Sequence, residues 1–285
     1  MIADRRSFLK ASAGAMAALT TPRDIDAIGS RPGRLKQSVS RWPYQRIPLP
    51  EFCQRAKQIG LVAIDLLYQD EWQVARDAGL VCSMGYPNRR RDFIATGFND
   101  PANHTMLLNE LESAIPLAAR AGVPNLIAMF GNRRGRSDAD GIAHCVNGLS
   151  KIKALAEENG VTVCVELLNS RVDHADYHGD RTAFGVEVMK GVGSARVKLL
   201  YDIYHMQIME GDVIRTIRQN LSWIEHFHTG GVPGRHELDD GQELNYRAIA
   251  RAIADLGFQG YLAHEFVPTR DPLTSLAEAV TICDV

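Results

Sequence analysis

The sequence of 285 residues has few cysteines, no surplus of either charge and no long apolar segment in its main part. Its five cysteines, an odd number, are scattered without a CxxC pair, which argues against a disulfide framework. Lysines and arginines number 32 against 34 aspartates and glutamates, so the formal net charge of −2 does not favour a nucleic-acid partner. Beyond the amino-terminal region no stretch is apolar for long enough to span a membrane.

The amino terminus has the pattern of an export signal. Residues 4–10 read DRRSFLK, with two consecutive arginines ahead of Phe-Leu-Lys, and residues 11–19 are small and mildly apolar. This arrangement resembles a twin-arginine leader, with Ala15 to Ala17 as a small-residue cleavage site. We therefore predict a signal in residues 1–27, a single domain in residues 28–285, and a periplasmic or secreted protein. Without a functional leader it would be cytoplasmic, and residues 1–27 would form an ordinary amphipathic helix.

Strand-like and helix-like segments alternate through the rest of the chain. The predicted strands are Leu35–Ser40, Leu61–Leu67, Leu80–Met84, Asn125–Phe130, Val161–Glu166, Val197–Tyr201, Trp223–His228 and Gly260–Glu265. The predicted helices are Pro50–Ile59, Glu71–Ala78, Asn99–Ala121, Ser137–Glu158, Thr182–Gly191, Asp212–Asn220, Asn245–Leu256 and Pro272–Val280. Eight such pairs predict an α/β fold, a (β/α)₈ TIM barrel. The alternative is an open doubly wound sheet, but the Gly-rich phosphate turn typical of such sheets is missing after the first strand.

Four of the predicted strands end in groups able to bind a metal ion. Glu166, Asp202, His228 and Glu265 close strands five to eight. The carboxyl ends of these strands are neighbours on one rim of a barrel, where such folds carry their active sites. Three carboxylates and one imidazole suit one divalent ion such as manganese, magnesium or cobalt, which would also offset the repulsion between the carboxylates. Taken singly, each residue could instead be a helix cap, a salt-bridge partner or a core histidine.

A metal flanked by two glutamates suits proton abstraction from a carbon next to a carbonyl group. The ion would polarise the carbonyl, and negative charge would be stabilised where it develops. One carboxylate would take the proton and the other would deliver one, to the adjacent carbon in an isomerase or to the opposite face in an epimerase. The residues alone do not distinguish these reactions.

Several segments resemble a known family. These are Val165 to Asn169 (VELLN), Asp202 to His205 (DIYH), His228 to Glu237 (HTGGVPGRHE) and His264 to Phe266 (HEF), together with Glu243 to Tyr246 (ELNY). They are similar to the hydroxypyruvate isomerase family of the xylose isomerase-like TIM barrels, and the resemblance covers nearly everything after the leader.

The resemblance implies a role for each matching residue. Glu166 and Glu265 would be the acid/base pair and also metal ligands, and Asp202 and His228 would complete the ligand set. His205 and Arg235 would hold substrate oxygens, while Asn169 and His236 would line the pocket. Simpler roles are a salt bridge from Arg235 to Glu237 or Asp239, helix capping by His205, and solvent exposure of His236.

The chain also departs from the family pattern. Cytoplasmic hydroxypyruvate isomerases typically have glutamine at the position of His228, where histidine resembles the ketose 3-epimerases. Those epimerases have a further glutamate at the position of Val172. The leader is also foreign to a cytoplasmic enzyme. These differences leave the substrate open.

The sequence thus supports several functions. The first is a metal-dependent isomerase of a small hydroxy-carbonyl substrate, with hydroxypyruvate converted to tartronate semialdehyde. A ketose or sugar epimerase would use the same metal site, and the barrel of either enzyme could form a homo-oligomer. A nuclease of the endonuclease IV type would need more clustered ligands and a basic cleft. A periplasmic sugar-binding protein without catalysis would not need the glutamate pair. No nucleic-acid partner is expected, and no membrane association of the mature form.

Overall fold

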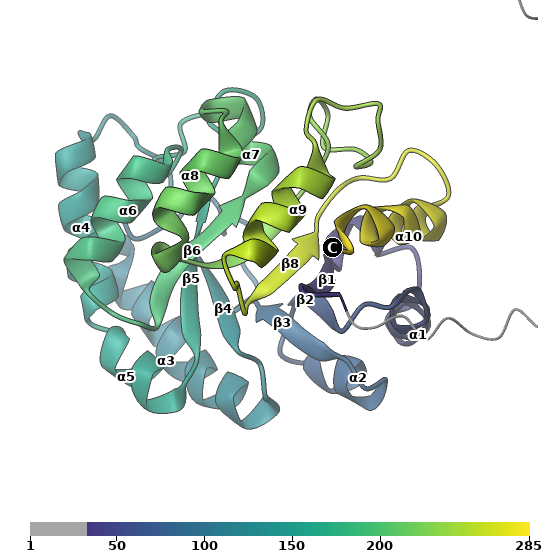
Figure 1. Cartoon of the computed structure of the whole chain (residues 1–285). Helices are drawn as coiled ribbons and strands as arrows, with labels where there is room; N and C mark the ends of the chain where they lie inside the picture. Colours follow the sequence, from purple (N-terminus) through teal and green to yellow (C-terminus); the bar gives the residue numbers. More distant parts are fainter. Residues whose placement is uncertain (1–32) are drawn as a thin grey trace, which may run out of the picture. The chain divides into compact units, whose positions relative to one another are not determined.

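The protein forms a closed barrel of eight parallel strands, seen in a computed structural model that describes residues 33–285. Neighbouring strands pair in chain order, and β1 pairs with β8 to close the barrel (Figure 1). The predicted TIM barrel is therefore confirmed. The strands are β1 Lys36–Ser40, β2 Ala63–Leu67, β3 Val81–Gly85, β4 Asn125–Met129, β5 Thr162–Leu167, β6 Val197–Asp202, β7 Ile224–Thr229 and β8 Tyr261–His264. The predicted leader lies outside the described residues.

Helices surround the barrel and cover the outward face of its strands (Figure 1). They are α1 Leu49–Ile59, α2 Trp72–Asp77, α3 His104–Ala121, α4 Asp138–Ser150, α5 Lys153–Asn159, α6 Thr182–Val192, α7 Ile203–Met209, α8 Val213–Asn220, α9 Tyr246–Asp255 and α10 Pro272–Cys283, with short 3₁₀ turns at Trp42–Tyr44 (η1), Pro101–Asn103 (η2) and Leu221–Trp223 (η3). Strands β2, β4 and β5 are buried along their whole length, as expected for strands packed on both faces. Among residues 33–285, no helix combines the length and hydrophobicity that crossing a membrane requires.

The helix predicted over Ser137–Glu158 is interrupted, and this prediction was wrong in its length. It begins as predicted, with the Ser137 hydroxyl accepting a hydrogen bond from the Asp140 amide. At its end the Lys151 amide turns back to the Gly148 carbonyl at 3.1 Å, a tighter turn than that of an α-helix. Gly148 packs so closely on Phe98 that a Cβ there would lie 2.6 Å from the ring. The break thus lies just after Gly148, a poor helix former that no larger residue could replace without a clash.

Helix α7 was not predicted, and it matters for the site. Strand β6 passes directly into α7 with no loop, so the apolar run contains no turn signal. The Asp202 carboxylate caps the helix, accepting hydrogen bonds from the amides of Tyr204 at 2.8 Å and His205 at 3.3 Å. An aspartate at this position satisfies amides that the helix leaves unpaired. The cap holds one oxygen of Asp202 in place and sets His205 on the first turn, so His205 is capped rather than capping.

Candidate functional site

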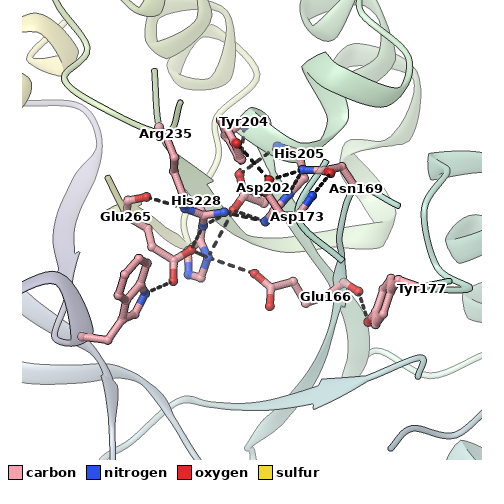
Figure 2. A network of polar contacts seen from close by, with 12 residues as sticks. Glu166, Asn169, Asp173, Tyr177, Asp202, Tyr204, His205, His228, Arg235 and Glu265 are labelled. Atoms are coloured by element: carbon pink, nitrogen blue, oxygen red, sulfur yellow. Dashed lines mark hydrogen bonds and ion pairs between the residues drawn. The ribbon is translucent and has the colours of Figure 1, made fainter. Parts of the chain in front are cut away.

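The structure brings Glu166, Asp202, His228 and Glu265 into one buried cluster. Their ligand atoms all lie within 4.8 Å of one another. The Nδ1 atom of His228 is 2.6 Å from Glu265 Oε2 and 3.2 Å from Glu166 Oε1. Figure 2 shows the two glutamates approaching His228 from the left and from the right. Four residues that lie far apart in the sequence therefore converge on one point.

Strand register explains this convergence. Asp202 and His228 are direct partners in the ladder between β6 and β7, so their side chains leave the sheet side by side. Glu166 lies one residue before the end of β5, and Glu265 follows the last residue of β8. Because side chains alternate along a strand, the apolar neighbours of Glu166 point to the opposite face. The barrel thus aims all four polar groups at its carboxyl rim.

Asp65, in the second strand, holds the far side of the His228 ring. Its Oδ2 lies 2.8 Å from His228 Nε2, and its Oδ1 accepts a hydrogen bond from the Ser83 hydroxyl at 2.6 Å and lies 3.1 Å from His226 Nε2. Burial opposes ionisation of Asp65, but the two histidines outweigh it and lower its pKa. Burial opposes protonation of His228, but Glu265, Asp65 and Glu166 outweigh it and raise its pKa well above the usual value, so without a metal the ring is a cation. A divalent ion that replaced the Nδ1 proton would leave the Nε2 proton shared with Asp65. Sequence reasoning missed this residue, although a lone acid in an apolar strand was its signal.

Arg235 supplies a positive charge over the same cluster. Its Nη2 atom lies 2.7 Å from Asp202 Oδ2 and also contacts Glu265 Oε2. The loop reaches this position through left-handed backbone at Gly234 (φ 87°) and Arg235 (φ 58°). The simpler role, a salt bridge to Glu237 or Asp239, is therefore wrong. Glu237 instead binds the Thr269 and Arg270 amides and the Ser275 hydroxyl.

The two glutamates differ in acidity. Burial, reinforced by the neighbouring charges of Glu265 and Asp202, raises the pKa of Glu166 to about 7 despite its contact with His228. Burial also opposes ionisation of Glu265, but the positive charges of His228 and Arg235 outweigh it and lower its pKa to about 2. A pair of carboxyl groups with separated pKa values is the arrangement of an acid and a base.

A second layer of side chains fixes His205. Its Nε2 lies 2.5 Å from Arg235 Nη1, and its Nδ1 lies 2.6 Å from the amide nitrogen of Asn169. Asn169 also donates to Asp173, which accepts a further bond from the Tyr204 hydroxyl at 2.9 Å (Figure 2). Burial and the charge of Arg235 lower the pKa of His205 well below its usual value, so the ring is neutral. Both ring nitrogens face N–H donors, so His205 can bind a substrate oxygen only after one of these two contacts opens.

A cavity of about 900 Å³ opens over these groups. Glu166, Glu265, His205 and Arg235 all line it. Asn169 lies behind His205 and is buried, so it supports the cavity wall rather than forming its surface. His236 is exposed and its Nδ1 contacts the Val267 carbonyl oxygen at 3.0 Å, so it is not among the lining residues.

The four converging residues fit a hard divalent ion. They offer three carboxylates and one imidazole, all buried, and no thiol belongs to the group. Oxygen-rich sets of this kind suit magnesium, manganese or cobalt. The neighbouring trio Asp65, His226 and His228 shares His228 with this cluster, so we assign Asp65 and His226 a supporting role.

Comparison with known proteins identifies the family. Residues 41–282 match the family described as xylose isomerase-like TIM barrel. A 2-oxo-tetronate isomerase of Cupriavidus necator is 40% identical over 113 residues, which cover 40% of this chain and 43% of that protein. A putative hydroxypyruvate isomerase of Mus musculus is 26% identical over 261 residues, covering 86% of this chain and 94% of that protein. The matched region thus covers less than half of the Cupriavidus necator protein and nearly all of the Mus musculus protein.

Two further proteins resemble this chain, one in sequence and one in fold. A D-psicose 3-epimerase of Agrobacterium fabrum is 34% identical over 135 residues, which cover 45% of this chain and 43% of that protein. The crystal structure of an AP endonuclease, family 2, from Brucella melitensis superposes with a TM-score of 0.75 at 21% identity and covers 87% of this chain and 99% of that chain. The latter likeness shows the fold alone.

Proposed function

Because the chain belongs to the xylose isomerase-like TIM barrel family, we propose that it is a metal-dependent isomerase of a small hydroxy-carbonyl compound. Hydroxypyruvate, converted to tartronate semialdehyde, is the first candidate substrate. The observation that carries the proposal is the convergence of Glu166 and Glu265 with Asp202 and His228 in one buried cluster. The relatives that are named as isomerases support the same reaction class.

The residues divide the chemistry between them. A divalent ion held by Glu166, Asp202, His228 and Glu265 would polarise the substrate carbonyl and stabilise developing negative charge. Arg235 and His205 bind substrate oxygens from the cavity wall. Glu265 removes a proton from C3 of hydroxypyruvate, and Glu166 delivers one to C2. A second proton passes from the C3 hydroxyl to the oxygen on C2. The C2 ketone thereby becomes an alcohol and the C3 alcohol becomes an aldehyde.

The direct test is turnover of hydroxypyruvate. The full chain is loaded with manganese, magnesium or cobalt, incubated with hydroxypyruvate, and assayed for tartronate semialdehyde. Glu265→Gln is the matched inactive variant, with circular dichroism to show that it folds. Absence of product with all three metals would remove hydroxypyruvate as a substrate.

A ketose or sugar epimerase is the second candidate. It is favoured by His228, a residue type that resembles the ketose 3-epimerases, and by the likeness to the Agrobacterium fabrum protein. An epimerase would wash solvent deuterium into one carbon while the carbonyl stays in place. An isomerase would move the carbonyl, so product analysis in deuterium oxide separates the two.

The other functions have less support. A nuclease with several metals needs several separate ligand sets, but in residues 33–285 the second candidate set shares His228 with the first and lies buried. A sugar-binding protein without catalysis would not require two carboxyl groups of different acidity. Export through the predicted leader and association into a homo-oligomer stay predictions of the sequence.

A further inference from the structure

The cavity over the glutamates is larger than a three-carbon acid requires. Its volume of about 900 Å³ is near the upper end of the range for pockets that hold drug-sized ligands. The reacting carbons must lie at the floor, beside Glu166 and Glu265. From these glutamates the lining extends to the loops that follow β2, β3 and β5, which contribute Tyr68, Phe93 and Val172.

One wall of this outer part is aromatic. Tyr68 and Tyr86 stack with ring centroids 4.7 Å apart, and Phe93 packs edge-on to Tyr86 at 5.3 Å. All three line the cavity. We call this set the aromatic wall.

Apolar side chains stay exposed around the same opening. Trp42, Val172 and Val267 line the cavity and are 39%, 69% and 38% exposed. They are three of the eight large apolar residues exposed in the described part of the chain. Apolar surface concentrated at the opening of a cavity marks a place where a ligand excludes water.

The polar groups of the outer cavity are nearly balanced in charge. Arg90 pairs with Glu110 at 3.0 Å and with Asp92 at 3.4 Å. Arg91, Asp92 and Asp173 also belong to the cavity lining. The side chains of Asn132 and His174 belong to the cavity lining and have no hydrogen-bond partner among residues 33–285. This favours a neutral ligand with hydroxyl groups over a phosphate or another polyanion.

We propose that the outer cavity is a subsite for a neutral sugar ring, so that the substrate is a keto sugar carrying a glycosyl unit at the end remote from its carbonyl. The proposal rests on the proposed function of the glutamate site and extends its substrate. A pyranose presents an apolar face of C–H groups and an edge of hydroxyls. The apolar face packs against the aromatic wall and Val172, and the hydroxyls bond to Asn132 and His174. Burial of one such face strengthens binding about tenfold.

The experiment compares substrates with and without the second ring. The manganese-loaded full chain is given D-fructose, hydroxypyruvate and two ketose disaccharides whose second ring is not on a carbon next to the carbonyl, isomaltulose (linked through O6) and lactulose (linked through O4). Solvent deuterium wash-in gives kcat/KM for each. We expect at least one disaccharide to exceed D-fructose about tenfold, and Phe93→Ala and Val172→Asp to lower that ratio to near one.

A matched control separates the subsite from general damage. Trp223 lies in η3, just before β7 and outside the cavity lining, so Trp223→Ala should keep the ratio of the unchanged chain. If hydroxypyruvate or D-fructose reacts as well as every disaccharide, the subsite is overturned while the isomerase assignment stands. If no compound exchanges deuterium, the proposed function fails and calorimetry decides the subsite. Binding of a disaccharide that weakens in Phe93→Ala supports it, and equal or absent binding of all sugars overturns it.

Discussion

The imidazole of His228 is held between Asp65 and the three carboxylates of the cluster. Its Nε2 lies 2.8 Å from Asp65 Oδ2, and its Nδ1 lies 2.6 Å from Glu265 Oε2. The two contacts use opposite nitrogens of one ring, so the bond to Asp65 decides which nitrogen carries the proton. Asp65 thereby prepares His228 as a ligand, a role that carboxylates commonly have behind metal-binding histidines.

Replacement of Asp65 should weaken metal binding. In Asp65→Asn a neutral amide replaces the carboxylate that accepts the hydrogen bond from His228 Nε2. We therefore expect about 10- to 100-fold weaker affinity for manganese. Competition with a fluorescent chelator measures this independently of activity. Ser83→Ala, which removes only one hydrogen bond to Asp65, should have a much smaller effect. Equal affinities of the unchanged chain and Asp65→Asn would show that Asp65 does not position the ring.

Metal binding should also stabilise the fold. An ion that binds only the folded state adds about 2.7 kcal/mol when its free concentration is 100 times Kd. We expect manganese to raise the midpoint of thermal unfolding and a chelator to reverse this. Glu166→Gln should lose most of the increase because it removes one of the charged donors of the cluster. The exposed Glu187, which pairs with Lys190, gives the control Glu187→Gln, which should keep the increase. A metal response unchanged by Glu166→Gln would place the ion elsewhere.

The two glutamates should be separately essential for proton transfer. Removal of a general acid or base costs about 10²- to 10⁴-fold in rate. We therefore expect Glu166→Gln and Glu265→Gln each to lower kcat for the best substrate by at least about 10²-fold, with folding retained. Chemical quench or nuclear magnetic resonance of the product gives kcat, and deuterium wash-in reports abstraction alone. Full wash-in in Glu265→Gln would mean that abstraction does not need this carboxylate, which would contradict the role assigned to Glu265.

Much of the fold and the core of the site could be predicted from the sequence for a local reason. A buried strand is a short apolar run, and a polar residue at its end stands out, as Glu166 and Asp202 do. The closed barrel then brings consecutive strand ends together without further information. Helix α7 was missed because β6 leads into it without a turn, and its cap, Asp202, looked only like a strand end.

The contacts that could not be predicted depend on loop geometry. The bond from Arg235 to Asp202 spans 33 residues and needs the left-handed backbone at Gly234 and Arg235. No periodic pattern encodes such a path. The same holds for His236, which the loop turns toward Val267 and solvent. Asp65 was visible in the sequence, but its partner His228 is 163 residues away.

Export can be tested apart from catalysis. The leader rests on the consecutive arginines Arg5 and Arg6, which are the defining feature of a twin-arginine signal. We propose that Arg5→Lys with Arg6→Lys leaves the chain in the cytoplasm, while the unchanged chain reaches the periplasm. Fractionation and immunoblotting measure the distribution. Arg23→Lys, which makes the same substitution in the same region but outside the pair, is the control and should still be exported. A cytoplasmic location of the unchanged chain would contradict the leader.

Glu237 should make stability depend on acid pH. Burial opposes its ionisation, but hydrogen bonds from the Thr269 amide and hydroxyl and from Ser275 lower its pKa from 4.5 to about 2. Because the folded chain binds the proton less readily than the unfolded chain, this stabilisation is present above pH 4.5 and is lost as pH falls toward 2. Hydrogen bonds to a charged group contribute about 2 kcal/mol, so Glu237→Gln should lower the free energy of unfolding by about that amount at pH 7. Urea unfolding at a series of pH values should show the difference shrinking between pH 4.5 and 2.

Glu278→Gln, at an exposed ion pair with Arg270, is the control and should cost far less at pH 7. A gap for Glu237→Gln that stays constant with pH would mean that its charge does not stabilise the loop.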